Sequence, residues 1–322
     1  MKYTLLGALF AAFVAGCCSE QPYMAKDRLA RGLVVVLPGI EGRSGYNEAI
    51  CRGLDAGGVV CAIELHDWTS SLGPLYNLRA YDRNRRMASQ LGWRLTRYMW
   101  EYPECPVVLV GQSGGGAVAL WTAEQMLPGY KVDGIVMLAA SVSPKYVLEF
   151  ALAKTREGIV NFYSPRDWLF LGLGTTVYGT MDGRHSHSAG QLGFEIMHNS
   201  PDARAYNKLY QVPWRPEMAA SGNAGMHLTS GAEDFVARYV APLVVAVSGK
   251  QKWSKELVEQ VIGLEGVGHE SPTTAPTLSV AHGTGSVVMN EPASQPATRP
   301  IRGPAMSQPA GQPASRPIDC PG

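Results

Sequence analysis

The stretch PVVLVGQSGGGAVALWTAEQML, residues 106–127, carries the pattern that decides the fold. Its first five residues are apolar and mostly β-branched, which predicts a buried parallel strand. Residues 117–127 are good helix formers, and a Pro-Gly pair ends that helix. The glycines between strand and helix permit a sharp turn, which we expect to hold its apex residue, Ser113, in strained backbone geometry. The Ser113 hydroxyl is then expected at the open end of a sheet, beside the amides that begin a helix.

The segment Gly111-Gln112-Ser113-Gly114-Gly115, between that strand and that helix, resembles the nucleophile elbow of the α/β-hydrolase family. This family contains esterases, lipases and related acyl-transfer enzymes. The resemblance implies an α/β fold, with a mostly parallel sheet flanked by helices on both faces and the site at the carboxyl ends of the strands. It also implies that Ser113 is the nucleophile. A glycine-rich turn that contains a serine by chance is the alternative.

The rest of the chain supplies the elements that such a sheet needs. Short apolar runs predict further strands, and apolar residues at helical spacing predict the helices between them. The further strands are expected over 32–37, 59–65, 134–140, 158–163 and 206–214. The helices are expected over 46–54, 80–101, 145–156 and 233–240.

Two residues in later loops fit the other members of a Ser-His-Asp triad. Asp167 follows the expected strand over 158–163, where the family places the acid that orients its histidine. His227 lies on a glycine-rich loop between the last expected strand and the helix after it, where the family places its general base. The order Ser113, Asp167, His227 is also the family's order. His269, in the sequence Gly-Val-Gly-His, is a rival for the base, and ordinary turn chemistry is the alternative for Asp167.

The strand expected over 32–37 runs into Pro38-Gly39-Ile40-Glu41-Gly42. This loop resembles the His-Gly loop of the family, with proline in place of histidine. By that resemblance the backbone amide of Ile40 is one donor of an oxyanion hole, and the amide of Gly114 is the second. A tight turn that needs glycine only for its backbone is the alternative.

Other polar pairs invite a chemical interpretation that their context does not support. His66 and Asp67 are neighbours in an extended segment, so we expect their side chains on opposite faces and a structural or rim role. His185 and His187 have no Cys or carboxylate cluster beside them, so no metal and no cofactor is expected. Asp133 precedes a strand and is expected at the edge of the sheet away from the site.

Composition argues against a nucleic-acid partner. The 322 residues carry 28 Lys and Arg against 27 Asp and Glu, a formal net charge of +1, whereas nucleic-acid binding calls for a basic surface. The densest basic run, Arg79 to Arg97, also has apolar residues at helical spacing. We interpret it as a helix with one core face and one solvated face.

The N-terminus has the features of an exported protein. An apolar stretch over 5–14, too short to span a bilayer, follows Lys2 and is typical of a secretory signal. The next residues, Val-Ala-Gly-Cys, resemble the lipobox of bacterial lipoproteins, and by that resemblance Cys17 is acylated and begins the mature chain. An ordinary cleaved signal is the alternative. We expect a protein of the bacterial cell envelope, held to a membrane by a lipid anchor without spanning it.

Two further features concern stability and order rather than chemistry. Cys51 and Cys61 are candidates for a disulfide in an oxidising compartment, which spacing alone does not establish. From about residue 271 the chain is rich in Pro, Ser, Thr, Gln and Ala and has no aromatic residue, so we expect disorder. The expected organisation is a signal peptide over 1–16, a linker over 17–30, a hydrolase domain over 31–265 with a candidate lid over 168–205, and a tail over 266–322.

Together these residues predict a serine hydrolase that needs no cofactor. It is expected to cleave an ester-type bond, a carboxylic ester or thioester, in a small molecule or a lipid, through an acyl-enzyme intermediate. An acyltransferase that uses the same three residues is one alternative, and no motif separates it from a hydrolase. A catalytically silent envelope lipoprotein that keeps the fold as a binding module is another.

Overall fold

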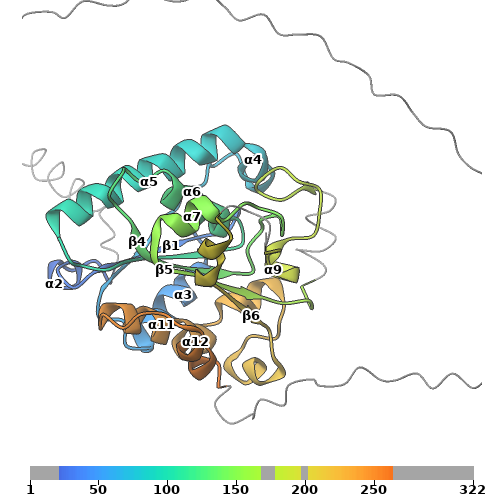
Figure 1. Ribbon diagram of the computed structural model, residues 1–322. Coiled ribbons are helices and arrows are strands. Elements are labelled where there is room, and N and C mark those ends of the chain that lie inside the picture. Colours follow the sequence, from blue (N-terminus) through green and yellow to red (C-terminus); the bar gives the residue numbers. More distant parts are fainter. Residues whose placement is uncertain (1–21, 168–177, 197–201, 264–322) are drawn as a thin grey trace, which may run out of the picture. The chain divides into compact units, whose positions relative to one another are not determined.

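The computed structural model describes residues 22–167, 178–196 and 202–263. This part of the chain contains a six-stranded sheet in the order β2-β1-β3-β4-β5-β6, and every pairing in it is parallel. The strands are β1 (Leu33–Leu37), β2 (Ala62–Leu65), β3 (Val107–Gln112), β4 (Val132–Leu138), β5 (Thr155–Tyr163) and β6 (Leu209–Pro213). The sheet lies between two layers of helices (Figure 1), which confirms the expected α/β fold.

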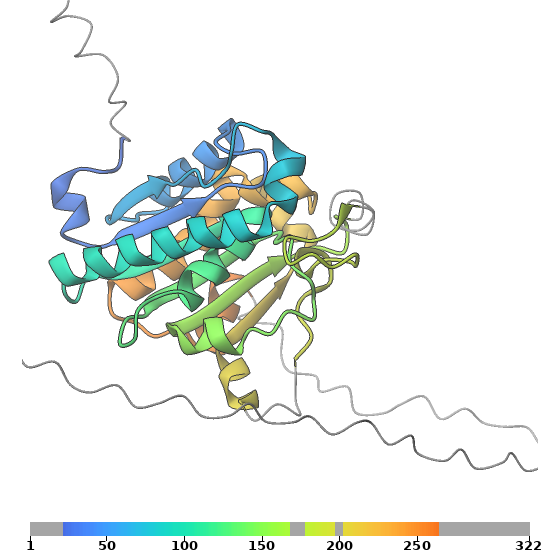
Figure 2. The same cartoon turned by 90° about the horizontal axis from the view of Figure 1, so that it is seen from above.

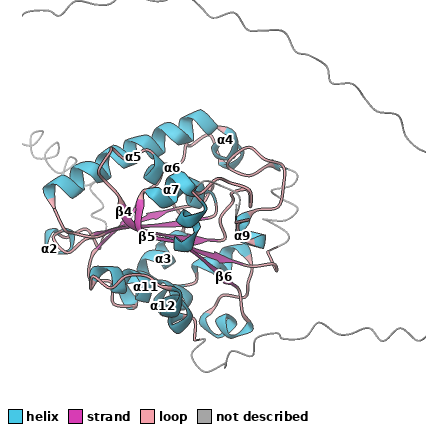
Figure 3. Cartoon of the chain, viewed as in Figure 1, coloured by secondary structure: helices cyan, strands magenta, loops and turns pink. Residues whose placement is uncertain are grey.

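Helices cover both faces of the sheet (Figures 1 and 3). One layer holds α5 (Tyr81–Glu101), α6 (Gly114–Glu124) and α7 (Glu149–Ala153), and the other holds α3 (Gly45–Ala56), α11 (Ala241–Ser248) and α12 (Lys255–Val261). Shorter helices are α2 (Lys26–Leu29), α4 (Pro74–Arg79), α9 (Ala189–Leu192) and α10 (Glu233–Phe235). Short 3-10 helices span Ala203–Lys208, Pro216–Ser221 and His227–Gly231, and a π-helical turn spans Val236–Val240.

The core has two halves because side chains alternate along each strand. In β1, Val35 belongs to the apolar cluster beneath α5 and α6, whereas Val34 and Val36 belong to the cluster beneath α3 and α11. All residues of β1, β2, β3 and β4 are buried. This continuous burial is typical of a parallel sheet covered on both faces, and it fixes the strand ends on which the loops of the site are built.

The prediction of a helix over 145–156 is largely wrong. The helix there, α7, has five residues, and β5 already begins at Thr155. Thr155 pairs with Val132 of β4, and its hydroxyl donates to the Leu152 carbonyl. Pairing with a neighbouring strand therefore overrides the local helix propensity of this segment.

Other boundaries differ by a few residues. The last strand is shorter than expected, because residues 203–208 form a 3-10 helix before it. The helix expected over 233–240 continues to Ser248, past Pro242, with a π-helical turn over Val236–Val240. A proline lacks the amide that would extend the hydrogen-bond ladder, and a wider turn just before it accommodates that loss.

Cys51 and Cys61 are both free thiols, so the disulfide considered above is not formed. The Cys61 sulfur lies 3.2 Å from the Ser248 hydroxyl oxygen and 3.3 Å from the Arg31 carbonyl oxygen. Burial raises the pKa of Cys51 to about 12, which keeps that thiol protonated and unreactive at neutral pH.

The predicted signal peptide over 1–16, Cys17, His269 and the tail over 266–322 lie outside the described residues, as do residues 168–177 and 197–201 of the candidate lid. Within the described part of the chain, no helix combines the length and the apolar character that crossing a membrane requires.

Glycines at the turn after β3 let three backbones pass close to one another. A Cβ on Gly115 would press against the carbonyl oxygens of Leu37 and Pro38, and a Cβ on Gly111 would lie 2.5 Å from the Gly115 carbonyl oxygen. Gly115→Ala is therefore expected to lower the free energy of unfolding by about 1–3 kcal/mol, as overpacking against backbone does. Denaturant titration followed by circular dichroism measures this change.

Gly45→Ala is the matched control, because a Cβ on Gly45 in the first turn of α3 meets no atom within 4 Å. We expect it to leave stability unchanged or slightly raised. Equal stabilities of the two variants would contradict the close approach at Gly115.

Candidate active site

Ser113 lies on the turn between β3 and α6. Its backbone has φ 53° and ψ −119°, a conformation that non-glycine residues rarely adopt. The turn is held by β4, since the Ser113 amide donates to the Leu138 carbonyl at 2.9 Å. The Ser113 carbonyl accepts from the amides of Gly116 at 3.1 Å and Ser141 at 3.0 Å. The strained residue is therefore fixed by its neighbours, and its side chain leaves the carboxyl end of β3.

His227 and Asp167 come from two other loops and meet Ser113. The Nε2 atom of His227 lies 2.9 Å from the Ser113 Oγ atom, and its Nδ1 atom lies 2.8 Å from Asp167 Oδ2. Asp167 follows β5, and His227 begins the second of the two 3-10 helices that follow β6. Their exposed fractions are 7% for His227, 6% for Ser113 and 1% for Asp167. The structure thus brings the three sequence-predicted residues into one hydrogen-bonded chain, most of it shielded from water.

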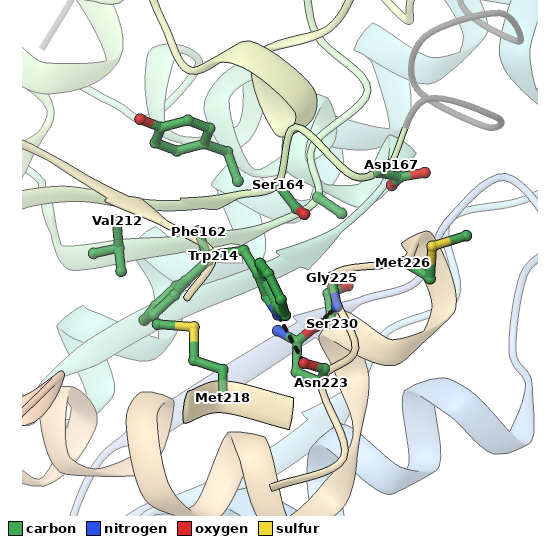
Figure 4. A pocket seen from close by; sticks show the side chains of 12 residues that line it. Phe162, Ser164, Asp167, Val212, Trp214, Met218, Asn223, Gly225, Met226 and Ser230 are labelled. Atoms are coloured by element: carbon green, nitrogen blue, oxygen red, sulfur yellow. Dashed lines mark hydrogen bonds between the residues drawn. The ribbon is translucent and has the colours of Figure 1, made fainter. Parts of the chain in front are cut away.

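The loop that carries His227 is fixed by a network that the sequence did not reveal. The Trp214 indole donates to the Asn223 carbonyl at 2.7 Å, and the Asn223 side-chain oxygen accepts from the Gly225 amide at 2.9 Å (Figure 4). The Ser230 hydroxyl donates to the carbonyl of His227 at 2.9 Å. An Asn two residues before a Gly is a turn signal that sequence alone offers, but the contact with Trp214 is not.

Asp167 lines one side of a small cavity of about 20 Å³, whose other walls include the apolar side chains of Phe162, Val212, Trp214 and Met218 and the polar ones of Ser164, Asn223 and Ser230. In Figure 4 the Asp167 carboxylate lies apart from the four apolar side chains. The Oδ1 atom of Asp167 has no hydrogen-bond partner within the described part of the chain. Among those residues, the imidazole of His227 is therefore the group that compensates the buried carboxylate, which favours a strong interaction between the two side chains.

The backbone of Ile40 lies against that of Gly114, the residue after Ser113. A Cβ on Gly114 would lie 3.5 Å from the Ile40 nitrogen and 2.8 Å from the Ile40 Cγ2 atom. Neither amide donates to a backbone carbonyl within the described residues. Two N–H groups at the start of a helix, neither bonded to a backbone carbonyl in the described part of the chain, would favour a negative charge beside them.

The orientation of each amide is set through the carbonyl of its own peptide group. The Gly39 carbonyl accepts from the Gly42 amide at 3.1 Å, and the Ser113 carbonyl is held by two donors as described above. Because a trans peptide directs its N–H away from its C=O, these bonds fix the direction of both amides. Two side chains hold the Ile40 loop, since Asn77 donates to the Ile40 carbonyl at 2.9 Å and Trp68 to the Pro38 carbonyl at 2.8 Å. No signal in the sequence pointed to Asn77 or Trp68.

The other sequence candidates have structural contacts. His66 Nδ1 lies 3.3 Å from Glu64, and the Asp67 carboxylate accepts from Thr69 and from the Arg43 amide. Asp133 accepts a hydrogen bond from the Val107 amide at 2.7 Å and pairs with Arg156 at 2.9 Å. It lies at the amino end of β4, whereas Ser113 follows the carboxyl end of β3.

The two histidines after residue 184 form no metal site with described neighbours. His187 Nδ1 lies 2.8 Å from the Gln191 side-chain oxygen. Throughout residues 22–167, 178–196 and 202–263, no group of three or more His, Cys, Asp or Glu side chains is placed to hold a metal ion.

The all-parallel sheet and the strand-to-helix turn that presents Ser113 define an α/β-hydrolase fold. Similar solved structures include the dienelactone hydrolase-like promiscuous phosphotriesterase P91 from metagenomic libraries, at 16% identity and a TM-score of 0.41, covering 66% of this chain and 85% of that one. The esterase domain of a Rhodothermus marinus protein shares 18% identity at a TM-score of 0.38, covering 70% and 90%. Aspergillus fumigatus lipase B shares 10% sequence identity at a TM-score of 0.40, and the match covers 76% of this chain and 63% of the lipase.

No protein-family model matches the chain, and no curated protein sequence matches it. The three solved structures share 10–18% of their residues with this chain, at TM-scores of 0.38–0.41.

Proposed function

We propose that this protein is a serine hydrolase that cleaves a carboxylic ester or thioester through an acyl-enzyme intermediate. The observation that carries the proposal is the hydrogen-bonded chain from Ser113 Oγ through His227 to Asp167, with separations of 2.9 and 2.8 Å. These are the separations at which a hydroxyl, a base and an orienting carboxylate act together. The strained backbone at Ser113 supports it, because such strain persists where the surrounding structure maintains it and is concentrated at functional sites.

In the first half of the reaction, His227 Nε2 accepts the Ser113 proton while Oγ bonds to the carbonyl carbon. Asp167 holds the imidazole through Nδ1–H and stabilises the imidazolium that forms. The carbonyl oxygen gains negative charge and accepts hydrogen bonds from the amides of Ile40 and Gly114. Imidazolium then donates its proton to the departing alcohol or thiol, which leaves an ester between the acyl group and Ser113.

In the second half, water replaces the alcohol. His227 takes a proton from that water, the hydroxide attacks the acyl carbon, and the same two amides again receive the oxyanion. Collapse of this intermediate returns the proton to Ser113 and releases the acid. No metal or cofactor takes part in these steps.

A cavity of about 400 Å³ is the proposed place for part of the substrate. It lies between α4, the start of α5 and residues 178–185. Met181 lines it, and a Cβ on Gly114 would lie 3.3 Å from the Met181 sulfur. Leu78, next to the Asn77 that holds Ile40, lines it from the other side. The cavity therefore adjoins the proposed oxyanion site.

We also propose that the enzyme works in the bacterial cell envelope, attached to a membrane through an acyl group on Cys17. The support is the apolar stretch over 5–14 followed by Val-Ala-Gly-Cys. Globomycin, an inhibitor of lipoprotein signal peptidase, should cause the precursor to accumulate. An unchanged processing pattern would argue for an ordinary cleaved signal.

A fluorophosphonate probe tests the proposed chemistry without a known substrate. We expect the folded wild-type protein to gain one covalent probe per chain, because the activated Ser113 Oγ attacks phosphorus as it would attack a carbonyl. Intact-protein mass spectrometry measures the label. Ser113→Ala is expected to stay unlabelled, whereas Ser89→Ala, in the helix α5, should label as the wild type does. A folded wild type without label would favour the silent binding module.

A further inference from the structure

The outer face of α5 exposes two tryptophans. The exposed fraction is 60% for Trp93 and 77% for Trp100. In contrast Trp68, Trp121 and Trp253 are each no more than 4% exposed. Tryptophan is highly buried on average, so two such rings on one helix call for an explanation beyond solvation.

The two rings belong to one stripe of the helix. Trp93, Arg97 and Trp100 follow the i, i+4, i+7 spacing that places side chains on one face, and Arg86 and Gln90 extend the stripe toward the start of the helix. We call these five residues the tryptophan face, and all five are exposed. The tryptophan face is the convex outer side of a helix and forms no groove.

The two arginines of the tryptophan face differ from Arg85 and Arg94 of α5 in their ion pairing. Arg85 pairs with Glu124 at 3.3 Å and Arg94 pairs with Glu64 at 2.7 Å. Neither Arg86 nor Arg97 has a carboxylate within ion-pair distance in the described part of the chain. The tryptophan face therefore combines two indoles with two cations that are available to an anionic partner.

The beginning of the described chain lies at the same end of α5 as Trp100. The Tyr98 hydroxyl donates to the Leu29 carbonyl at 2.7 Å, and α2 lies beside that end of α5 (Figures 1 and 2). The chain reaches Pro22 seven residues earlier, and Cys17 precedes Pro22 by five residues, about 17 Å when fully extended. An acyl group on Cys17 would keep this end of the molecule close to a bilayer.

We propose that the tryptophan face docks on the surface of the bilayer that holds the acyl anchor, with anionic phospholipid as its ligand. Indole rings settle at the boundary between headgroups and acyl chains, and arginines pair with lipid phosphates. The anchor supplies attachment, and the tryptophan face sets the orientation. This inference rests on the proposed acyl anchor at Cys17 and is independent of the proposed catalytic activity.

The contacts between Tyr98 and Leu29 and between Leu33 and Pro106 lie at the amino ends of the strands, whereas Ser113 follows the carboxyl end of β3. Ser113 therefore lies at the end of the strands opposite the end where the described chain begins.

Co-sedimentation with lipid vesicles tests the proposal. The parent protein is residues 17–322, the chain expected after removal of the signal peptide, with Cys17→Ser, so that neither the apolar stretch over 5–14 nor an acyl anchor is attached. The vesicles contain phosphatidylglycerol and phosphatidylethanolamine, or phosphatidylcholine alone. We expect Trp93→Ser/Trp100→Ser to weaken binding to phosphatidylglycerol vesicles at least about tenfold, since each indole buries apolar surface at the boundary. Arg86→Gln/Arg97→Gln should weaken binding to these vesicles and leave the weaker binding to phosphatidylcholine unchanged.

Tyr46→Ser/Leu72→Ser is the matched control, because these side chains are 52% and 69% exposed but lie outside the tryptophan face. It should bind as the parent does, and circular dichroism should show that every variant is folded. A tryptophan double variant that binds anionic vesicles as the parent does would overturn the proposal and leave the tryptophan face to a protein partner. A parent that binds both lipids equally, with no effect of the arginine changes, would overturn the role of anionic lipid.

Discussion

Replacing Ser113 by alanine is expected to lower kcat for an ester substrate by on the order of 10⁵- to 10⁶-fold, while the protein stays folded. The variant lacks the atom that forms the acyl-enzyme, so the residual rate comes from the oxyanion amides and from binding alone. Steady-state kinetics on the ester that the enzyme cleaves fastest measures the loss. Because an alanine accepts the backbone conformation of Ser113 no less readily than serine does, thermal unfolding should change little.

The base is tested in the same assay. His227→Ala should lose about as much activity as Ser113→Ala, since residues that act as a unit have non-additive effects, and the double variant should be no slower than either single one. His269→Ala should retain full activity. An inactive His269→Ala beside an active His227→Ala would reassign the base, and activity retained in Ser113→Ala would place the nucleophile elsewhere.

Local patterns were sufficient to predict the elbow and most of the sheet. A buried strand, Ser113 and a helix that begins with three glycines follow one another over 107–124, so each expectation rests on neighbours in the chain. Asp167 and His227 were predicted by the order of the loops in a resembling family, and the structure places His227 against Ser113 and Asp167 against His227. Their distance from Ser113 is not encoded in any local pattern.

What the sequence could not supply are contacts between distant segments. Asn77 holds the Ile40 carbonyl, and Trp214 holds the loop before His227, yet both look like ordinary residues of a helix and a strand end. The same limit explains why the predicted helix over 145–156 was largely wrong. Thr155 pairs with β4 and begins a strand, and helix propensity summed over the segment does not include that pairing.

Asp167→Asn is expected to lower kcat by on the order of 10⁴-fold, with a small change in KM. The amide of an asparagine is able to donate to Nδ1, which favours the tautomer that carries its proton on Nε2 and leaves no base facing Ser113. The surroundings make this effect strong, because Asp167 is 1% exposed and Oδ1 has no partner within the described residues. The value of kcat and the rate of fluorophosphonate labelling should both fall.

Asp133→Asn separates this role from a structural one. Asp133 is also buried, at 9% exposed, but it holds the Val107 amide and Arg156 at the other edge of the sheet. Its replacement should lower the thermal midpoint, since a charged partner of Arg156 and a charge-assisted hydrogen bond are weakened, and should leave kcat within about twofold. Asp167→Asn should instead keep the thermal midpoint or raise it, because it removes a buried charge whose second oxygen is unpaired among these residues. If Asp167→Asn lost stability and kept its kcat, the carboxylate would be a structural group and the acid of the site would have to be another residue.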